Sequence, residues 1–155
     1  MPQTTQTSHE NKALKAAPVI VEESLNAPVE KVWKAITDRD QMAQWYFDLA
    51  EFRPELGFEF RFTGGPAPEK QYLHICKITE VELGKKLTYS WRYEGYEGES
   101  FVTFLLLPMG DNTVLRLTHA GLETFPTDNP DFASGNFVEG WNEIIRTALK
   151  QFLEG

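Results

Sequence analysis

Three side chains with polar tips fall on alternating positions of two apolar segments, where they could act on a small molecule. His119 follows Leu117 at a spacing of two, and Tyr89 and Trp91 alternate with polar residues in the same way. Because residues two apart on a strand share one face, all three are predicted to point inward. A histidine there could orient a bound molecule or act as a general base, while the tyrosine and the indole offer polar contacts inside an apolar wall.

The simpler interpretation of His119 is structural, namely a buried histidine held by a hydrogen bond to a backbone carbonyl, and we favour it. His74 lies in a segment, residues 71–81, that has no clean apolar face, so the sequence does not predict its direction. The two histidines could form a pair, but no spacing in the sequence requires one.

Catalysis requires several positioned groups rather than a single histidine. The sequence contains no Gly-x-Ser-x-Gly, no His-Glu-x-x-His and no glycine-rich phosphate loop. Cys76, the single cysteine, falls within a strand-like segment and is interpreted as a small core residue rather than a nucleophile. We therefore assign no catalytic residue, no metal ligand and no cofactor, and we favour a protein that is not an enzyme.

The aromatic content is the most informative part of the composition. Aromatic residues make up 13% of the chain, with 4 Trp, 5 Tyr and 11 Phe. Either they fill an ordinary core, or they line an apolar pocket between a curved sheet and a helix, and the sequence leaves both interpretations open. The predicted walls of such a pocket are Phe60, Tyr89, Trp91, Phe104, Leu117, His119, Phe137 and Trp141.

The composition also excludes several classes of partner. The 155 residues carry a formal net charge of −8, so the chain offers no large cationic face to nucleic acid or to an anionic membrane. One cysteine excludes an internal disulfide and a cysteine-based zinc site. No apolar run reaches the roughly 7–15 residues of a secretory signal or the about 20 residues of a membrane span. A free thiol agrees with a reducing compartment, so we expect a cytoplasmic protein.

The hydrophobic pattern predicts the elements that position these side chains. Residues 1–16 are polar and are predicted to form a flexible tail, followed by a single domain over residues 17–155. A β-branched run from Val19 to Leu25 predicts a first strand, and apolar residues at helical spacing predict a helix that ends near Ile36, with Asn26 or Ala27 as its N-cap. A second, shorter helix is predicted from Met42 to Trp45, capped by the Thr37–Asp38 pair.

Period-two alternation then predicts a run of about five or six further strands. Residues 64–68, with their glycines and prolines, are predicted to form a loop, and residues 121–135 a longer irregular one. Short turns imply antiparallel pairing. The chain ends in an amphipathic helix, the one long element available to cover the apolar face of the sheet. Its predicted apolar stripe is Phe137, Trp141, Ile144, Ala148 and Phe152, widened by Ile145 and Leu149.

Four blocks in this order resemble a known family. Residues 25–38, 57–62, 87–92 and 115–122, the last followed by Gly140-Trp141, are similar to the START-like superfamily. More closely, they resemble the branch named for the activator of heat-shock protein 90 ATPase, over roughly residues 17–154. The resemblance implies an α+β helix-grip fold, in which a curved antiparallel sheet wraps around a long C-terminal helix, often with a cavity between them.

The resemblance also implies a range of functions. Superfamily members bind lipids, sterols, polyketides or other hydrophobic molecules, and some are cyclases or hydrolases. We predict binding of a small hydrophobic molecule between the sheet and the C-terminal helix. The alternatives are a stress-related module that contacts a chaperone, as in the two-domain co-chaperone whose C-terminal domain this chain resembles, and an enzyme of the polyketide-cyclase type. No pattern in the sequence indicates an oligomeric state.

Overall fold

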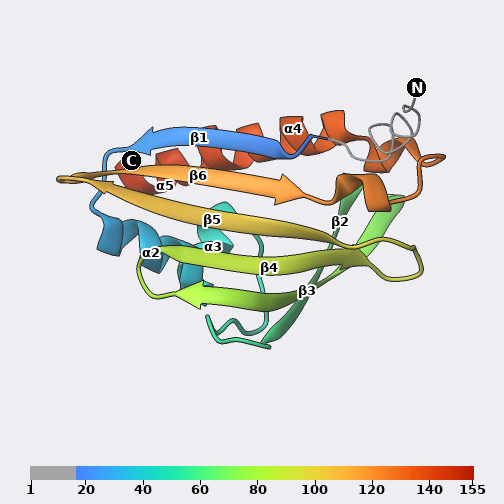
Figure 1. The fold of residues 1–155 in the computed structure, drawn as a ribbon, viewed down its shortest axis with the longest axis horizontal. Coiled ribbons are helices and arrows are strands. Elements are labelled where there is room, and N and C mark those ends of the chain that lie inside the picture. The colour runs from blue at the N-terminus through green and yellow to red at the C-terminus, as the bar shows by residue number, and fades with distance from the viewer. Residues whose placement is uncertain (1–16) are drawn as a thin grey trace, which may run out of the picture.

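The computed structural model describes residues 17–155, so the predicted tail, residues 1–16, lies outside the described residues. Within residues 17–155, six strands form one antiparallel sheet in the order β1-β6-β5-β4-β3-β2. Figure 1 shows the C-terminal helix running along one face of this sheet. The strands are β1 Val19–Leu25, β2 Glu59–Ala67, β3 Lys70–Glu82, β4 Lys86–Tyr93, β5 Ser100–Met109 and β6 Asn112–Ala120. The α+β helix-grip fold is therefore confirmed.

Strand β2 extends further than the sequence pattern predicts. The prediction of a loop over residues 64–68 was wrong, because Gly64 pairs with Tyr72 and Ala67 pairs with Lys70 of strand β3, with a register shift between these pairs. Strand β2 lies at the edge of the sheet and has a neighbouring strand on one side only. Pro66, which has no N–H to donate, is therefore tolerated there. Glycine and proline therefore continue the strand and also bend it.

Two short helices follow strand β1, as predicted. Helix α2 spans Val29–Thr37 and helix α3 spans Arg39–Trp45. The N-cap of helix α2 is Pro28 rather than Asn26 or Ala27, because the carbonyl of Pro28 accepts the first helical hydrogen bonds. The predicted cap of the second helix is confirmed, since the carboxylate of Asp38 accepts a hydrogen bond from the backbone N–H of Gln41.

The C-terminal helix spans residues 134–154 in three stretches. Helix α4, Ser134–Asn142, and helix α5, Lys150–Glu154, flank a π-helical segment, Glu143–Leu149. A π-helix has more residues per turn than an α-helix, so the mixture keeps residues four apart on one face. The fully buried stripe is accordingly Phe137, Trp141, Ile145, Leu149 and Leu153. Ile144, Ala148 and Phe152, which were predicted on this stripe, pack against its flank and are only half buried.

Ionic contacts attach the far end of this helix to strand β1. The carboxylate of Glu23 accepts hydrogen bonds from Arg146 at 2.6 Å and from Lys150 at 2.8 Å, and its side chain is only 16% exposed. The Lys150 hydrogen bond is the main reason why the pKa of Glu23 is lowered. Glu23 therefore holds the helix over the sheet. No helix within residues 17–155 is long and apolar enough to span a membrane.

Replacing this carboxylate tests its contribution to stability. We expect Glu23→Gln to lower the free energy of unfolding by about 1–2 kcal/mol, because it weakens two charge-assisted hydrogen bonds near the core. The matched control is Glu22→Gln, which breaks an exposed pair with Arg116 at 2.6 Å and should cost less than about 0.5 kcal/mol. Urea unfolding measures both. Equal effects of the two variants would show that the Glu23 contacts do not stabilise the helix.

Candidate functional site

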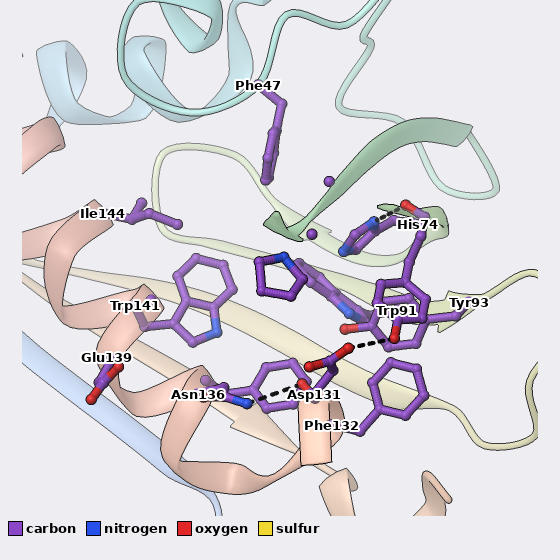
Figure 2. Close-up of a pocket in the computed structure, with 16 residues that line it drawn as sticks. Phe47, His74, Trp91, Tyr93, Asp131, Phe132, Asn136, Glu139, Trp141 and Ile144 are labelled. Carbon is purple, nitrogen blue, oxygen red and sulfur yellow. Dashed lines mark hydrogen bonds between the residues drawn. The ribbon is translucent and has the colours of Figure 1, made fainter. Parts of the chain in front are cut away.

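A cavity of about 540 Å³ lies at one end of the molecule, between the sheet and the start of the C-terminal helix. Strands β2, β3 and β4 form one side, and helix α4 with the turn Pro130–Phe132 forms the other (Figure 2). Half of its lining residues carry aromatic rings, with His74 included. The lining residues are Phe47, Gly64, Gly65, Pro66, Tyr72, His74, Trp91, Tyr93, Asp131, Phe132, Asn136, Phe137, Glu139, Gly140, Trp141 and Ile144.

Strand register places the aromatic floor of the cavity. His74 of strand β3 lies directly opposite Tyr93 of strand β4. Trp91 precedes Tyr93 by two residues on strand β4, so both side chains point to the same face. The three rings pack edge to face, with ring centroids 4.7 Å apart for His74 and Tyr93 and 5.0 Å apart for His74 and Trp91. Phe62 stacks on the His74 ring, with ring centroids 4.4 Å apart. All of these side chains are at least nine-tenths buried, so the floor is rigid.

The rim of the cavity is open to solvent and contains several glycines. Gly65 allows the close approach of strand β3, because a Cβ atom there would lie only 1.8 Å from the carbonyl oxygen of Lys70. Gly140 faces the cavity from helix α4, and a Cβ atom there would meet no heavy atom within 4 Å. Glycine in a helix interior is unfavourable, so its presence at this position keeps the rim open at a cost in helix stability.

Two polar atoms on the floor lack hydrogen-bond partners within residues 17–155. The indole Nε1 of Trp91 is buried and makes no hydrogen bond. The His74 ring approaches the backbone carbonyl of Tyr72 through Nδ1 at 3.0 Å, which assigns its proton to Nδ1 because a carbonyl can only accept. Figure 2 shows the other ring nitrogen, Nε2, directed toward the interior of the cavity. The cavity therefore presents one unused donor and one unused acceptor.

The mouth of the cavity carries a fixed acidic network. The hydroxyl of Tyr72 donates to the carboxylate of Asp131 at 2.6 Å and accepts from the side-chain amide of Asn129 at 3.2 Å. The hydrogen bond to Asp131 is the main reason why the pKa of Tyr72 is raised. Lys70 also contacts Asp131, at 3.6 Å. These contacts fix the turn Pro130–Phe132 against strand β3, so one wall of the cavity is held in place.

His119 belongs to a closed hydrogen-bond chain beside the cavity. Its Nδ1 accepts from the indole of Trp141 at 2.9 Å, and its Nε2 lies 2.7 Å from the hydroxyl of Ser100. That hydroxyl donates to the carbonyl of Trp91 at 3.2 Å. His119 is fully buried and burial lowers its pKa to about 3. Its partners are therefore two side chains, whereas a backbone carbonyl was expected, and both of its ring nitrogens are used.

The structure divides the predicted pocket residues into two groups. Three of them, Trp91, Phe137 and Trp141, line the cavity. The other five are buried in the adjacent core and do not line it: Phe60, Tyr89, Phe104, Leu117 and His119. The hydroxyl of Tyr89, considered as a polar handle for a ligand, is instead paired with Tyr46 at 2.6 Å. Burial raises the pKa of both phenols well above the ordinary value.

Sequence reasoning left out several residues of the floor and the walls. Tyr93 continues the alternation of Tyr89 and Trp91, so the same period-two pattern could have identified it. His74 and Tyr72 carry no comparable signal, because their direction follows from pairing with strand β2 and not from their own segment. Phe132 comes from an irregular turn, which periodicity cannot place.

The family model that matches this chain is described as Activator of Hsp90 ATPase homolog 1-like protein, and it covers residues 26–154. The chain belongs to this family. The match confirms the resemblance of the four sequence blocks to the Hsp90 ATPase activator branch of the START-like superfamily. A search of curated proteins finds no relative.

Solved structures show the same fold. Protein MLL2253 from Mesorhizobium loti is 28% identical, with a TM-score of 0.72, over 89% of this chain and 97% of that one. CalU16 from Micromonospora echinospora is 27% identical, with a TM-score of 0.68, over 88% of this chain and 76% of that one. DynU16, of the dynemicin biosynthetic locus, is 24% identical, with a TM-score of 0.72. The match covers 90% of this chain but only 48% of DynU16, so this chain spans about half the length of DynU16.

The ionisable groups of the cavity have shifted pKa values. Burial lowers the pKa of His74 to about 4, against the opposing effect of the carbonyls of Tyr72 and Phe62. An efficient general base has a pKa near the working pH, so His74 is suited to accept a hydrogen bond rather than to remove a proton. Burial likewise raises the pKa of Tyr93. Within residues 17–155, no group of three or more His, Cys, Asp or Glu side chains is arranged to hold a metal ion.

The two buried histidines should make stability depend on pH. Both have a lower pKa in the folded protein, about 4 for His74 and about 3 for His119, than the ordinary value of 6.5. The unfolded chain therefore binds more protons below pH 6.5. We expect the stability to be constant above about pH 6.5 and to fall as the pH drops from there, by up to about 1.4 kcal/mol per pH unit for each histidine.

Urea unfolding between pH 7 and pH 5 measures this slope, and NMR of the imidazole nitrogens reports each ring directly. The rings of His74 and His119 should remain neutral at pH 5 in the folded protein. An imidazole at either position that titrates near pH 6.5 would contradict the buried, neutral histidines of this structure.

Proposed function

We propose that the protein binds a small, flat hydrophobic molecule in the cavity between the sheet and helix α4, without chemical conversion. The observation that carries the proposal is an open cavity of about 540 Å³ with a rigid aromatic floor. Ligand pockets typically measure about 300–1,000 Å³ and are lined by apolar and aromatic side chains with a few polar groups. The cavity matches this description in both size and lining.

Aromatic rings from the sheet, from the helix and from the segment after helix α3 favour an aromatic guest. Trp91 and Trp141 lie on the sheet and on the helix, and their ring centroids are 5.8 Å apart at the inner end of the cavity. Phe47 reaches in from the segment after helix α3, as Figure 2 shows. Burying an apolar ligand against these rings contributes about 25 cal/mol per Å² of surface removed from water, and offset or edge-to-face ring contacts add to it.

The proposal includes the absence of turnover and a cytoplasmic location. A polyketide-cyclase-like activity would need several polar groups that converge on the cavity with suitable pKa values. His74 is too weak a base at neutral pH. Cys76 is a free thiol buried in the core, in keeping with a reducing compartment.

Family membership supports a second candidate, a surface module that contacts a chaperone. The family's description names an activator of the Hsp90 ATPase. Such a contact would depend on exposed side chains, whereas ligand binding depends on the space inside the cavity. A substitution that fills the cavity from its rim therefore separates the two functions, because it weakens ligand binding and changes the outer surface at the rim alone.

Filling the cavity tests ligand binding directly. We expect Gly140→Leu to weaken the binding of the neutral fluorescent probe N-phenyl-1-naphthylamine at least about tenfold, because the leucine occupies space that a Cβ atom there leaves free. The matched control is Gly135→Leu on the same helix. A Cβ atom at Gly135 also meets nothing within 4 Å, but Gly135 does not line the cavity. Probe fluorescence at pH 7 gives both affinities.

Both glycine substitutions should leave the fold intact, since replacing a helical glycine removes a penalty of about 0.5–1 kcal/mol. Thermal unfolding followed by circular dichroism checks this. Wild-type protein that does not bind the probe, or a Gly140→Leu variant that binds it as tightly as wild type, would contradict the proposed site.

A further inference from the structure

The unused donor and acceptor on the cavity floor define what a ligand must offer. Trp91 is 6% exposed and its indole N–H has no hydrogen-bond partner within residues 17–155. His74 is 8% exposed, and its Nε2 makes no hydrogen bond to the described residues once Nδ1 is engaged by the carbonyl of Tyr72. Buried polar groups are almost always paired, so the unpaired N–H of Trp91 indicates a missing partner. His74 Nε2, directed into the same cavity, offers an acceptor near it.

The neighbouring tyrosine does not supply that partner. The indole of Trp91 favours the ionised form of Tyr93, but burial outweighs this effect and keeps the phenol neutral. The indole N–H of Trp91 lies close enough to this phenol to affect its pKa, but the geometry between them does not form a hydrogen bond. The hydroxyl of Tyr93 therefore adds a third polar group on the same side of the cavity, while the donor of Trp91 and the acceptor of His74 remain available.

The charges around the cavity select against anions. Its lining includes Asp131 and Glu139 and, among the described residues, no lysine or arginine. Lys70, the cation beside the mouth, contacts Asp131. Figure 2 shows Glu139 pointing away from the centre of the cavity, so its carboxylate contributes a negative field without a direct contact. A carboxylate ligand would enter an apolar site with no compensating charge, which is unfavourable.

We propose that the cavity recognises an uncharged aromatic alcohol, whose hydroxyl accepts a hydrogen bond from Trp91 Nε1 and donates one to His74 Nε2. A hydroxyl group suits this role because it is both a donor and an acceptor. The two rings lie edge to face with centroids 5.0 Å apart, so the groups that they bind must lie on one edge of the guest. The inference rests on the proposed function, since it names the chemical class that the cavity binds.

Three probes of similar shape test this recognition in the full-length protein. At pH 7, 2-naphthol is neutral, 2-methylnaphthalene has the same shape without a hydroxyl, and 2-naphthoate is an anion. Displacement of N-phenyl-1-naphthylamine measures the affinity of each. We expect 2-naphthol to bind about tenfold more tightly than 2-methylnaphthalene, because its hydroxyl pairs with the buried donor of Trp91 and with the acceptor of His74. We expect 2-naphthoate to bind more weakly than either.

Two variants test whether Trp91 and His74 cause the preference for 2-naphthol over 2-methylnaphthalene. Trp91→Phe and His74→Phe each remove one polar atom and keep an aromatic ring, and each should reduce the preference for 2-naphthol to about threefold or less. The affinity of each variant for 2-methylnaphthalene is measured as well, so that the preference is taken within one variant and a general change of the floor cancels. Trp33→Phe is the matched control, since Trp33 lies on helix α2, packs partly buried against the core and does not line the cavity, and it should keep the full preference.

The outcomes separate this inference from the proposed function. If all three probes fail to bind, the proposed function is wrong and the recognition falls with it. If 2-naphthol and 2-methylnaphthalene bind equally well to the wild-type protein, the cavity binds flat molecules and only the recognition of a hydroxyl is overturned. If 2-naphthoate binds most tightly, the cavity selects anions and the inference is again overturned.

Discussion

The hydrogen bond from the indole of Trp141 to His119 joins the C-terminal helix to the sheet at the inner boundary of the cavity. On one side of this bond the space between the two layers is filled, with Phe104 and Leu117 fully buried. On the other side, Trp91 and Trp141 face open space. Because His119 is also bonded to Ser100, the contact is fixed from both directions. The position of Trp141, and hence the wall of the cavity, depends on it.

The rest of the architecture follows from having one helix to cover a curved six-stranded sheet. The π-helical segment keeps the buried stripe of this helix facing the sheet beyond Trp141, and Glu23 attaches it near the C-terminus. At the other end, the turn Pro130–Phe132 is held against strand β3 by Tyr72 and Asp131. The helix is therefore held at both ends, and the contact between Tyr72 and Asp131 also fixes one wall of the cavity.

Much of the fold could be predicted from period-two and helical patterns, since these report directly which face of an element is buried. The same patterns placed Trp91, Phe137 and Trp141 on inward faces, and all three line the cavity. They could not separate these residues from Tyr89, Phe104 or His119, because a filled core and a cavity wall impose the same inward direction. The difference depends on long-range contacts: Tyr46 pairs with Tyr89, and the glycines of strand β2 and helix α4 leave space that only the folded chain defines.

The central claim is that this cavity holds a small molecule. Native mass spectrometry of the protein purified from its own host tests it most directly. The account predicts a species heavier than the 17.7 kDa polypeptide, whose extra mass is lost on denaturation and belongs to a neutral aromatic compound. A protein that appears only at the mass of the bare chain, under conditions that preserve noncovalent complexes, would contradict it.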